Sequence, residues 1–547
     1  MRGFRSTHPH PGPPAHFQGE GWGEGVFTSA ILVAILLLGL WLRWGLNGAW
    51  RLSPDEALYA SWARQVTSGV DPWLAHTPGV DKPPVLIYAI AAAMSFYGDT
   101  EFATRFPNII ASAVSILLVY LIAAHLYGSQ VALLSALAMA LSPFAILYAP
   151  TAYADPLLVM WLLLAAVLAQ RRRWALAGLG AALAILTKPE ALVLLPLVAV
   201  LGLPSAGGER KPAHPVHDYL RGLLFFSIVC AVVTVAVEGL WQWLRPGQPS
   251  PLGLGLGNYG GIGLVAPQEA VVRLVGWWDE ALRWVFVSPQ LNLLLAAGTI
   301  ALVVRLLWGA VRRDPPSSGS HRWPDAILLL ALAYLLLART VISFQLWHRY
   351  LLLAVPLLCI LLARIVDGLW DAIIRLVRHW PSPQPSPQQG EGGDAAKPTT
   401  LALRLVPLLL VAVLMLAPVR AALAGQVPVG SDHGVYWGIE QTALFVREQI
   451  PPGSVIYQHS LGWQFSYYIP GVHVDFWWYP SIDWLAATAA GRSEHSQYLI
   501  LPSTDPSDAI AAALGAYGLE LLPVHSALRP DGSVSFQTYR IVPVTGP

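Results

Sequence analysis

Long apolar runs separated by short polar loops dominate the pattern along the chain. A helix crosses the hydrocarbon core of a bilayer with roughly 20 apolar residues, and it satisfies its backbone hydrogen bonds internally. The pattern therefore predicts an α-helical polytopic membrane protein with about eleven transmembrane helices. The predicted spans lie at residues 27–48, 109–127, 131–147, 157–170, 174–187, 190–203, 221–243, 290–310, 326–343, 351–368 and 402–424.

A shorter apolar helix, predicted at Pro84–Tyr97, decides on which side of the membrane the loops lie. Its roughly fourteen residues are too few to cross a bilayer, so we place it along the outer interface as a juxtamembrane helix. With the N-terminus inside, the arginine and lysine clusters then fall in the inward loops, in agreement with the positive-inside rule. These clusters are Arg171–Arg173; Arg210, Lys211 and Arg221; Arg312, Arg313 and Arg322; and Arg375, Arg378, Lys397 and Arg404.

Changes in hydropathy and in proline and glycine content predict the domain boundaries. Residues 1–25 form a disordered cytoplasmic leader without a clear signal-peptide cleavage site. Residues 26–424 form the transmembrane domain, which includes a Pro/Gly-rich cytoplasmic linker at 381–400. Within this domain, residues 174–203 are too long for one span, and two short spans around Lys188 preserve the parity of the loops.

After residue 424 the hydropathy falls and the pattern becomes that of a compact α/β domain, predicted for residues 425–547. Because an odd number of spans precedes it, we expect this domain to be extracytoplasmic. Its predicted elements are an amphipathic helix at Tyr436–Gln449, strands at Ser454–Gln458, Gln497–Leu501 and Ser533–Val542, and a helix at Ser507–Tyr517.

Composition supports the membrane assignment and excludes other classes of protein. Hydrophobic residues make up 55% of the 547 residues, and charged residues only 12%. With 33 basic and 32 acidic residues, the chain has no overall field that would attract nucleic acid. Both cysteines, Cys230 and Cys359, lie inside apolar runs, which favours buried free thiols over a disulfide or a metal site.

The first outer loop, residues 49–108, gathers many of the scarce charges. A carboxylate beside a phosphate-binding cation can take a proton from a hydroxyl while the cation stabilises a phosphate leaving group. Polar groups concentrated at the boundary of an apolar protein are also typical of a functional site. We therefore predict a catalytic cavity on the outer face of the membrane. The charged residues here include Asp55, Glu56, Asp71, Asp81, Lys82, Asp99, Glu101 and Arg105.

Several of these residues have a purely structural alternative. Asp55 and Glu56 suit the first turn of a helix, where acidic groups act as caps. Lys82 could extend its ammonium to the lipid–water boundary without binding a ligand. Arg105 has Glu101 at helical spacing, which also fits a structural ion pair.

The same loop resembles a known enzyme family. The strings DEALYASWARQVTSGVDPW and DKPPVLIYAIAAAMSFYGDTEFATRFPNIIASAVSILLVYLIA are similar to the first outer loop and second span of the protein O-mannosyltransferase / lipid A aminoarabinose transferase family. Shorter matches follow at Ala152–Pro156, at Leu186–Pro189 and at His348–Leu351, with Pro356 further on. The resemblance covers about residues 27–370, and the C-terminal domain resembles the family only in position and size. It implies a GT-C fold glycosyltransferase that uses polyprenyl-phosphate sugars.

The resemblance also implies roles for the first-loop residues. Asp55 matches the catalytic acidic residue of the family, which is the expected general base on the acceptor hydroxyl. Glu56 is its usual neighbour in the family. We group Glu56 with Asp55 as a catalytic residue and expect it to support the loop. Lys82 matches the lysine that contacts the donor phosphate. It stands where the mannosyltransferase branch commonly has histidine, which favours the aminoarabinose-like branch.

Further positions complete the implied site. Asp81 stands where the aminoarabinose branch has an acidic metal-associated residue, and a divalent metal is left open because no partnering histidine aligns. Asp155 matches a second acidic position facing the same cavity, although it also fits a helix cap ahead of a proline. Arg105 and Arg349 are candidate donor-phosphate contacts. Arg349 also fits an interfacial arginine that reaches toward water.

The sequence therefore predicts a multi-pass plasma-membrane glycosyltransferase of the inverting GT-C type. It would move one hexosyl or pentosyl unit from a polyprenyl-phosphate donor to a hydroxyl of a lipid, glycan or protein on the outer face. Its partners would be the donor, the acceptor and membrane lipids, without nucleic acid. The alternatives are a transporter or lipid flippase without glycosyl-transfer chemistry, and an inactive scaffold whose outer domain recruits partners. A transporter would be expected to show internal repeats and charges near the bilayer midplane.

Overall fold

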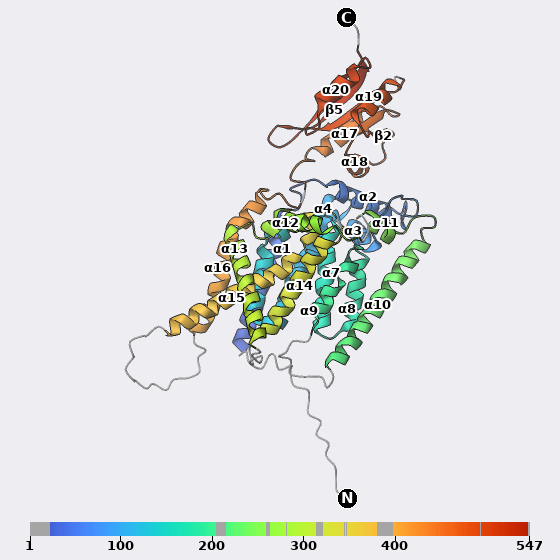
Figure 1. The fold of residues 1–547 in the computed structure, drawn as a ribbon. Coiled ribbons are helices and arrows are strands. Elements are labelled where there is room, and N and C mark those ends of the chain that lie inside the picture. Colours follow the sequence, from blue (N-terminus) through green and yellow to red (C-terminus); the bar gives the residue numbers. More distant parts are fainter. Residues whose placement is uncertain are drawn as a thin grey trace, which may run out of the picture.

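The computed structural model describes residues 22–203, 215–258, 263–280, 282–312, 321–343, 345, 347–379, 398–430, 432–492 and 494–544. A bundle of helices forms its larger part, and a small sheet domain stands over one end of the bundle (Figure 1). The predicted leader (1–25) and linker (381–400) lie almost wholly outside the described residues.

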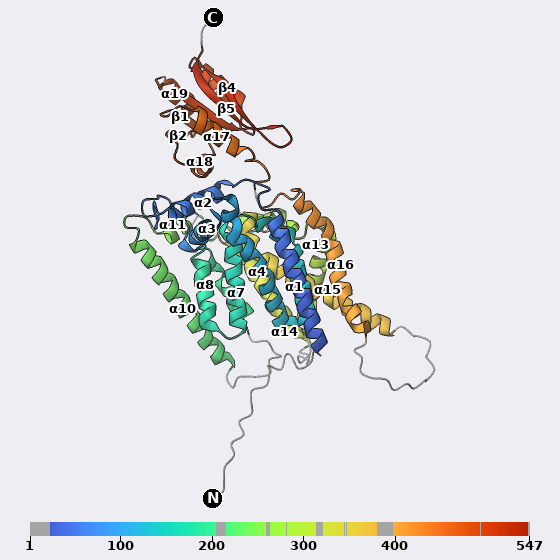
Figure 2. The same ribbon diagram turned by 180° about the vertical axis from the view of Figure 1, so that it is seen from behind.

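Six described helices are long and apolar enough to cross a membrane, so the predicted polytopic membrane protein is confirmed. They are α1 (Trp22–Gly45), α4 (Glu101–Tyr127), α10 (Pro215–Trp243), α13 (Pro289–Val311), α14 (Arg322–Val341) and α16 (Pro398–Leu423). Beside them run the shorter or more polar helices α5 (Ser129–Leu141), α6 (Pro143–Tyr148), α7 (Ala154–Gln170), α8 (Trp174–Ile185), α9 (Ala191–Leu201) and α15 (Ala354–His379). Figures 1 and 2 show helices of these two sets, among them α1, α4, α7, α8 and α10, side by side in one bundle.

Short helices cover the end of the bundle that faces the C-terminal domain (Figure 1). They are α2 (Pro54–Thr67), α3 (Pro84–Tyr97), α11 (Pro251–Asn258) and α12 (Pro267–Glu280). The helix predicted at Pro84–Tyr97 is thus confirmed as α3, with the same bounds. Prolines at the first position of α2 and α3 start both helices, because proline lacks the amide hydrogen that would be unsatisfied there.

The predicted division of residues 174–203 into two short helices is confirmed by α8 and α9. The turn between them contains Pro189, which cannot donate a backbone hydrogen bond and disfavours helical geometry in the preceding residue. The turn holds Lys188 and Glu190, and both side chains are buried. Cys230 and Cys359 are buried free thiols, as predicted.

The C-terminal domain contains a five-stranded sheet of order β2-β1-β3-β5-β4. The parallel strands are β1 (Val455–Gln458), β2 (Asp475–Trp478) and β3 (Gln497–Pro502), and the antiparallel pair is β4 (Leu519–Leu528) and β5 (Val534–Pro543). The helices are α17 (Ile439–Gln449), α18 (Gly462–Tyr468), α19 (Ile482–Ala490) and α20 (Ser507–Gly515).

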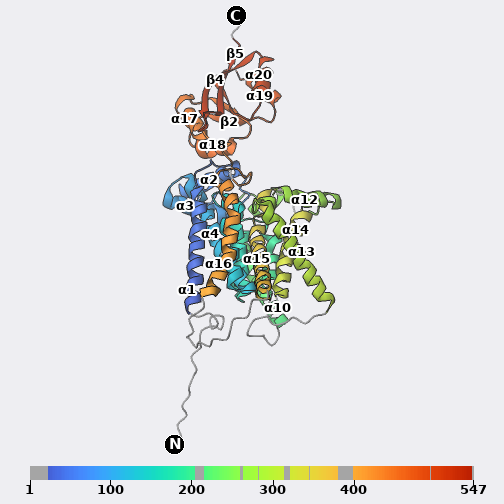
Figure 3. The same cartoon turned by 90° about the vertical axis from the view of Figure 1, so that its left-hand side faces the viewer.

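Two apolar clusters lie on the two faces of this sheet, one with α17 and α18 and the other with α19 and α20. Every element predicted in the domain is present, with bounds shifted by up to three residues. The prediction omitted the strands β2 and β4 and the helices α18 and α19. The two strands were missed because their residues do not alternate between apolar and polar. Figure 3 shows α18 at the side of the domain that faces the bundle.

Candidate functional site

A cavity of about 390 Å³ opens where the bundle meets its covering helices. This volume lies within the range of small-molecule sites, roughly 300–1,000 Å³. Four segments that are distant in the sequence build its wall, namely the start of α2, the turn before α3, the residue before α7, and the segment between α14 and α15. The lining residues are Ser53, Pro54, Asp55, Leu58, Tyr59, Asp81, Lys82, Tyr153, Gln345, Trp347, Arg349 and Tyr350.

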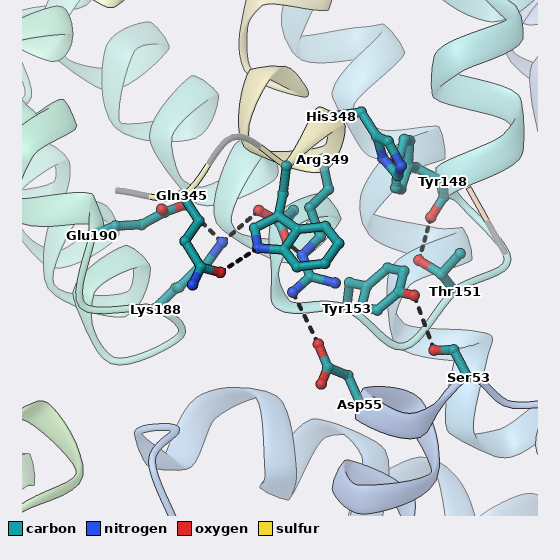
Figure 4. Close-up of polar contacts among 12 residues, drawn as sticks. Ser53, Asp55, Tyr148, Thr151, Tyr153, Lys188, Glu190, Gln345, His348 and Arg349 are labelled. Carbon is teal, nitrogen blue, oxygen red and sulfur yellow. Dashed lines mark hydrogen bonds and ion pairs between the residues drawn. The ribbon is translucent and has the colours of Figure 1, made fainter. Parts of the chain in front are cut away.

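Asp55 lies in the first turn of α2 and faces this cavity (Figure 4). Its side chain is 40% exposed, and its Oδ2 accepts a hydrogen bond of 2.9 Å from Nη2 of Arg349. Ser53 ends the preceding extended segment, and its backbone N–H donates to Glu56 Oε2 at 3.0 Å. The start of the helix is therefore fixed, while the Asp55 carboxylate remains accessible from the cavity.

Lys82 supplies a second cation from the turn before α3. Its Nζ lies 2.7 Å from Asp81 Oδ2 and 5.5 Å from the centre of the Tyr59 ring. Only 7% of its side chain is exposed, and this burial lowers the pKa of the Lys82 ammonium, against the opposing effect of Asp81. A compact ammonium charge in a cavity wall suits a phosphate oxygen.

Arg349 approaches the cavity from the 3-10 helix η3 (His348–Leu351). Its guanidinium lies 4.5 Å from the centre of the Tyr153 ring and 5.7 Å from that of Tyr350. Besides Asp55, its Nε lies 4.0 Å from Asp155 Oδ2. The aromatic rings fix the plane of the guanidinium, so that it can present a pair of donors to an anion.

Asp155 lies at the start of α7 behind the cavity wall, with its side chain 4% exposed. Its Oδ1 accepts a hydrogen bond of 2.7 Å from Lys188, which lies 2.9 Å from Glu190. Glu190 in turn pairs with Arg339 through two bonds of 3.0 and 3.2 Å. A row of alternating charges thus leads from Asp55 into the interior (Figure 4).

Sequence reasoning left Lys188 unassigned and missed the roles of Glu190 and Arg339. One signal was present, because charges inside apolar runs must find partners. The aromatic lining residues Tyr59, Tyr153, Trp347 and Tyr350, together with Gln345, were also missed as site residues. Aromatic residues are frequent throughout this chain, so their positions carried no separate signal.

Glu56 and Arg105 do not line the cavity, although the sequence grouped them with the site. Glu56 is fully buried and lies 3.4 Å from Arg105 Nε, and it also accepts a hydrogen bond of 2.8 Å from the Ala152 N–H. Arg105 lies 3.5 Å from Glu101, as the alternative reading of their helical spacing predicted. Both residues therefore have structural contacts that keep them away from a ligand in this cavity.

His348 borders the site without being predicted as part of it. Its Nδ1 makes a short contact with the Tyr148 hydroxyl, and the backbone carbonyl of Tyr148 accepts a hydrogen bond from the Thr151 hydroxyl (Figure 4). Burial lowers the pKa of His348 to about 4, so the ring is neutral near pH 7. A neutral imidazole here leaves Arg349 as the cation that η3 presents to the cavity.

The lining residues that the structure describes offer no complete ligand set of their own for the metal that the resemblance left open. Among the described residues, no three His, Cys, Asp or Glu side chains are grouped to share an ion. Asp81 instead accepts a hydrogen bond from Lys82. The cavity therefore offers an anion-binding set, made of an ammonium and a guanidinium, beside one accessible carboxylate.

Comparison with known proteins supports the resemblance. Residues 81–236 match the family model described as dolichyl-phosphate-mannose-protein mannosyltransferase. The chain is 27% identical over 234 residues to the undecaprenyl phosphate-alpha-4-amino-4-deoxy-L-arabinose arabinosyl transferase of Pectobacterium carotovorum, covering 40% of each protein. It is 29% identical over 324 residues to the enzyme of the same name from Pseudomonas paraeruginosa, covering 54% of this chain and 52% of the relative. The chain thus matches about half or less of the length of these curated relatives.

Solved structures extend the likeness to the fold of nearly the whole chain. The crystal structure of ArnT from Cupriavidus metallidurans bound to undecaprenyl phosphate has a TM-score of 0.59 at 16% identity, covering 96% of this chain and 99% of that one. The oligosaccharyltransferase AglB from Archaeoglobus fulgidus, in complex with an inhibitory peptide and a dolichol-phosphate, has a TM-score of 0.51 at 14% identity. The match covers 94% of this chain and 74% of the AglB chain. The predicted resemblance to the protein O-mannosyltransferase / lipid A aminoarabinose transferase family is confirmed, and the chain shares its overall fold with these solved structures.

Proposed function

We propose that this GT-C-fold chain is an integral membrane glycosyltransferase that moves a single sugar from a polyprenyl-phosphate donor to an acceptor hydroxyl. The observation that carries the proposal is the cavity that places the accessible carboxylate of Asp55 together with the cations of Lys82 and Arg349. The names of the relatives, which include undecaprenyl phosphate and dolichyl phosphate, support a lipid-linked donor.

The proposed reaction is one displacement at the anomeric carbon. The acceptor oxygen forms a new bond to that carbon, while the bond from the carbon to the phosphate oxygen breaks and its electron pair leaves with the polyprenyl phosphate. The acceptor proton passes to the Asp55 carboxylate, which acts as general base. Lys82 and Arg349 stabilise the charge that develops on the phosphate. Attack opposite the leaving group inverts the anomeric carbon.

Arg349 connects the two halves of this mechanism. In the structure its guanidinium holds the Asp55 carboxylate at 2.9 Å. A donor phosphate beside Arg349 would compete for the same guanidinium donors and leave the Asp55 carboxylate to accept the proton of the acceptor. Donor binding would therefore activate the base. Without a donor, the Asp55 carboxylate would stay paired with Arg349 and would be a weaker base.

We further propose eleven membrane crossings, with the cavity and residues 425–547 on the outer face of the plasma membrane. The start of α7 lies at the cavity, and its 17 residues span about 25 Å, so the following Arg171–Arg173 lie at the opposite end of the bundle. The end of α14 also lies near the cavity, which places Arg322 at the same opposite end. Basic residues gathered at that end support a cytoplasmic assignment.

The sugar and acceptor are open within this proposal. The relatives' names include an arabinosyl transferase and a mannosyltransferase, so both a pentosyl and a hexosyl donor are candidates. The acceptor hydroxyl would belong to a lipid, a glycan or a protein. Partners would be the lipid-linked donor, this acceptor and the surrounding membrane lipids.

The test uses the full-length protein purified in detergent. It is incubated with undecaprenyl phosphate carrying 4-amino-4-deoxy-arabinose or mannose, together with cell-envelope extracts as acceptors, and mass spectrometry follows glycosylated products and free undecaprenyl phosphate. We expect donor consumption with the native protein and with Asp508→Asn, an exposed change in the C-terminal domain. Asp55→Asn should reduce it by about 10²–10⁴-fold. Movement of lipid across proteoliposomes without donor consumption would favour the transporter alternative and overturn the proposal.

A further inference from the structure

One side chain of α18 in the C-terminal domain, Tyr468, contacts both the loop that leads to Asp55 and the start of α4. The Tyr468 hydroxyl accepts a hydrogen bond of 2.9 Å from the backbone N–H of Leu52, which is fully buried. The same hydroxyl donates a hydrogen bond of 2.5 Å to Oε1 of Glu101 at the start of α4. One phenol thus joins the C-terminal domain, the loop before α2 and a membrane helix.

Two arginines reinforce this contact on either side of Asp55. Arg51, next to Leu52, pairs with Glu440 of α17 at 2.7 Å and lies 4.5 Å from the centre of the Trp437 ring. Arg64, further along α2, donates a 2.8 Å hydrogen bond to the backbone oxygen of Tyr467. The C-terminal domain therefore holds residues both before and after Asp55.

The transmembrane domain holds the same loop from its other side. The Ser53 N–H donates to Glu56, and the Ser53 hydroxyl accepts a hydrogen bond of 2.9 Å from Tyr153, which lines the cavity. Leu52 and Ser53 are thus held by different domains, immediately before the turn that directs the Asp55 carboxylate toward Arg349. A loop held at consecutive residues by two domains keeps its geometry only while both contacts persist.

We propose that Tyr468 is a positioning residue through which the C-terminal domain sets the geometry of Asp55, an inference that rests on the proposed function. A buried backbone N–H without a partner is costly, so loss of the phenol oxygen would make Leu52 shift toward another acceptor or toward water. Displacement of a reacting group by about 1 Å can reduce a rate by about 10²-fold. Because Lys82 and Arg349 come from other segments, both cations would stay in place and donor binding would not be weakened.

The first experiment compares Tyr468→Phe with Tyr467→Phe. The control also removes a buried hydroxyl from α18, one whose bond goes to Thr104 rather than to the Asp55 loop. Hydrogen–deuterium exchange of the detergent-solubilised protein is measured by mass spectrometry for peptides covering residues 50–58. We expect faster exchange there in Tyr468→Phe only. Equal exchange in both variants and the native protein would overturn the proposal.

The second experiment separates positioning from a general structural role. With the donor that the native protein consumes, we expect Tyr468→Phe to lower kcat by about 10-fold or more, without raising the KM for the donor or weakening the binding of undecaprenyl phosphate. A purely structural role would lower thermal stability and leave the kcat of the folded fraction at the native value, which would contradict the inference.

A milder variant covers the case in which Tyr468→Phe does not fold. Glu440→Gln removes the charge and one of the two acceptors from the neighbouring Arg51 contact, at a side chain that is 43% exposed, and should give a smaller increase in exchange. Undisturbed exchange in this variant, together with an unfolded Tyr468→Phe, would count against positioning. If the native protein consumes neither donor, the proposed function fails, whereas the exchange measurement still decides whether Tyr468 holds the loop.

Discussion

Asp55 and Glu56 are adjacent acids in the first turn of α2, yet their surroundings are opposite. Asp55 is 40% exposed and faces a cavity, where its partner is a guanidinium that also lines the cavity. Glu56 is fully buried and contacts Arg105, the Ala152 N–H and the Ser53 N–H. The helix turns by about 100° per residue, so neighbours in sequence point in different directions.

Lys82 and Lys188 repeat the contrast among the cations. Lys82 lines the cavity and has Asp81 beside it, whereas Lys188 is enclosed by Asp155, Glu190 and the ring of Tyr350 at 4.0 Å. In both comparisons, the residue whose charge is enclosed by partners (Glu56 or Lys188) contributes to the packing of the fold. The residue that lines the cavity (Asp55 or Lys82) is placed where a ligand could contact it. Changes at cavity-wall charges should reduce activity, and changes at enclosed charges should reduce stability.

The largest expected effect is on catalysis by Asp55. Asp55→Asn keeps the size of the side chain and removes its ability to take a proton, so the transfer rate should fall by about 10²–10⁴-fold. Thermal unfolding followed by tryptophan fluorescence should remain at the native temperature. Initial rates for this variant are compared with those of Asp508→Asn, and a fully active Asp55→Asn would remove Asp55 from the mechanism.

The next effect concerns stability at Glu56. Glu56→Gln leaves the Arg105 guanidinium, with its side chain 1% exposed, short of one charged partner, and breaking a buried pair costs about 3–5 kcal/mol. Because Glu101 lies 3.5 Å from Arg105 and still pairs with it, we expect the loss of stability to lie near the lower of these values. Yield and unfolding temperature measure the effect. Native stability together with lost transfer would instead place Glu56 in the chemistry.

A smaller effect is expected on donor binding through Lys82. Lys82→Gln removes one charge-assisted hydrogen bond, and such bonds contribute about 1.5–3 kcal/mol, or roughly 10- to 150-fold in affinity. The measurement is binding of undecaprenyl phosphate to the detergent-solubilised protein. Lys188→Gln is the matched variant, and it should lower the unfolding temperature more than Lys82→Gln does. If Lys82→Gln lowered the unfolding temperature more than Lys188→Gln, the contrast between charges at the cavity wall and enclosed charges would be wrong.

The smallest effect is a pH dependence of the same binding. Burial lowers the pKa of the Lys82 ammonium, so Lys82 loses its proton as pH rises before an ordinary lysine would. We expect undecaprenyl phosphate to bind several-fold more weakly as pH approaches the usual lysine range, because the cation is lost. In Lys82→Arg, which stays protonated, the decline should be absent. An identical pH profile in both proteins would show that Lys82 is not the titrating group.

Local pattern was sufficient for much of the fold. Apolar runs predicted the membrane helices because lipid admits only helices with internally satisfied backbones and sufficient length, and prolines fixed the starts of α2 and α3. Strand β2 and strand β4 escaped prediction because edge strands with exposed residues on both faces have no alternating signal.

By itself, the sequence determined the class of protein, most of the apolar helices, and a polar first loop in which Asp55, Asp81 and Lys82 line one cavity. Only the tertiary structure decided that Arg349, 294 residues away from Asp55, completes the cavity, and that Arg105 does not. It alone placed Tyr468 of the C-terminal domain against the loop that leads to Asp55. The physical reason is that burial and pairing of a charge depend on segments brought together by packing, which local periodicity cannot record.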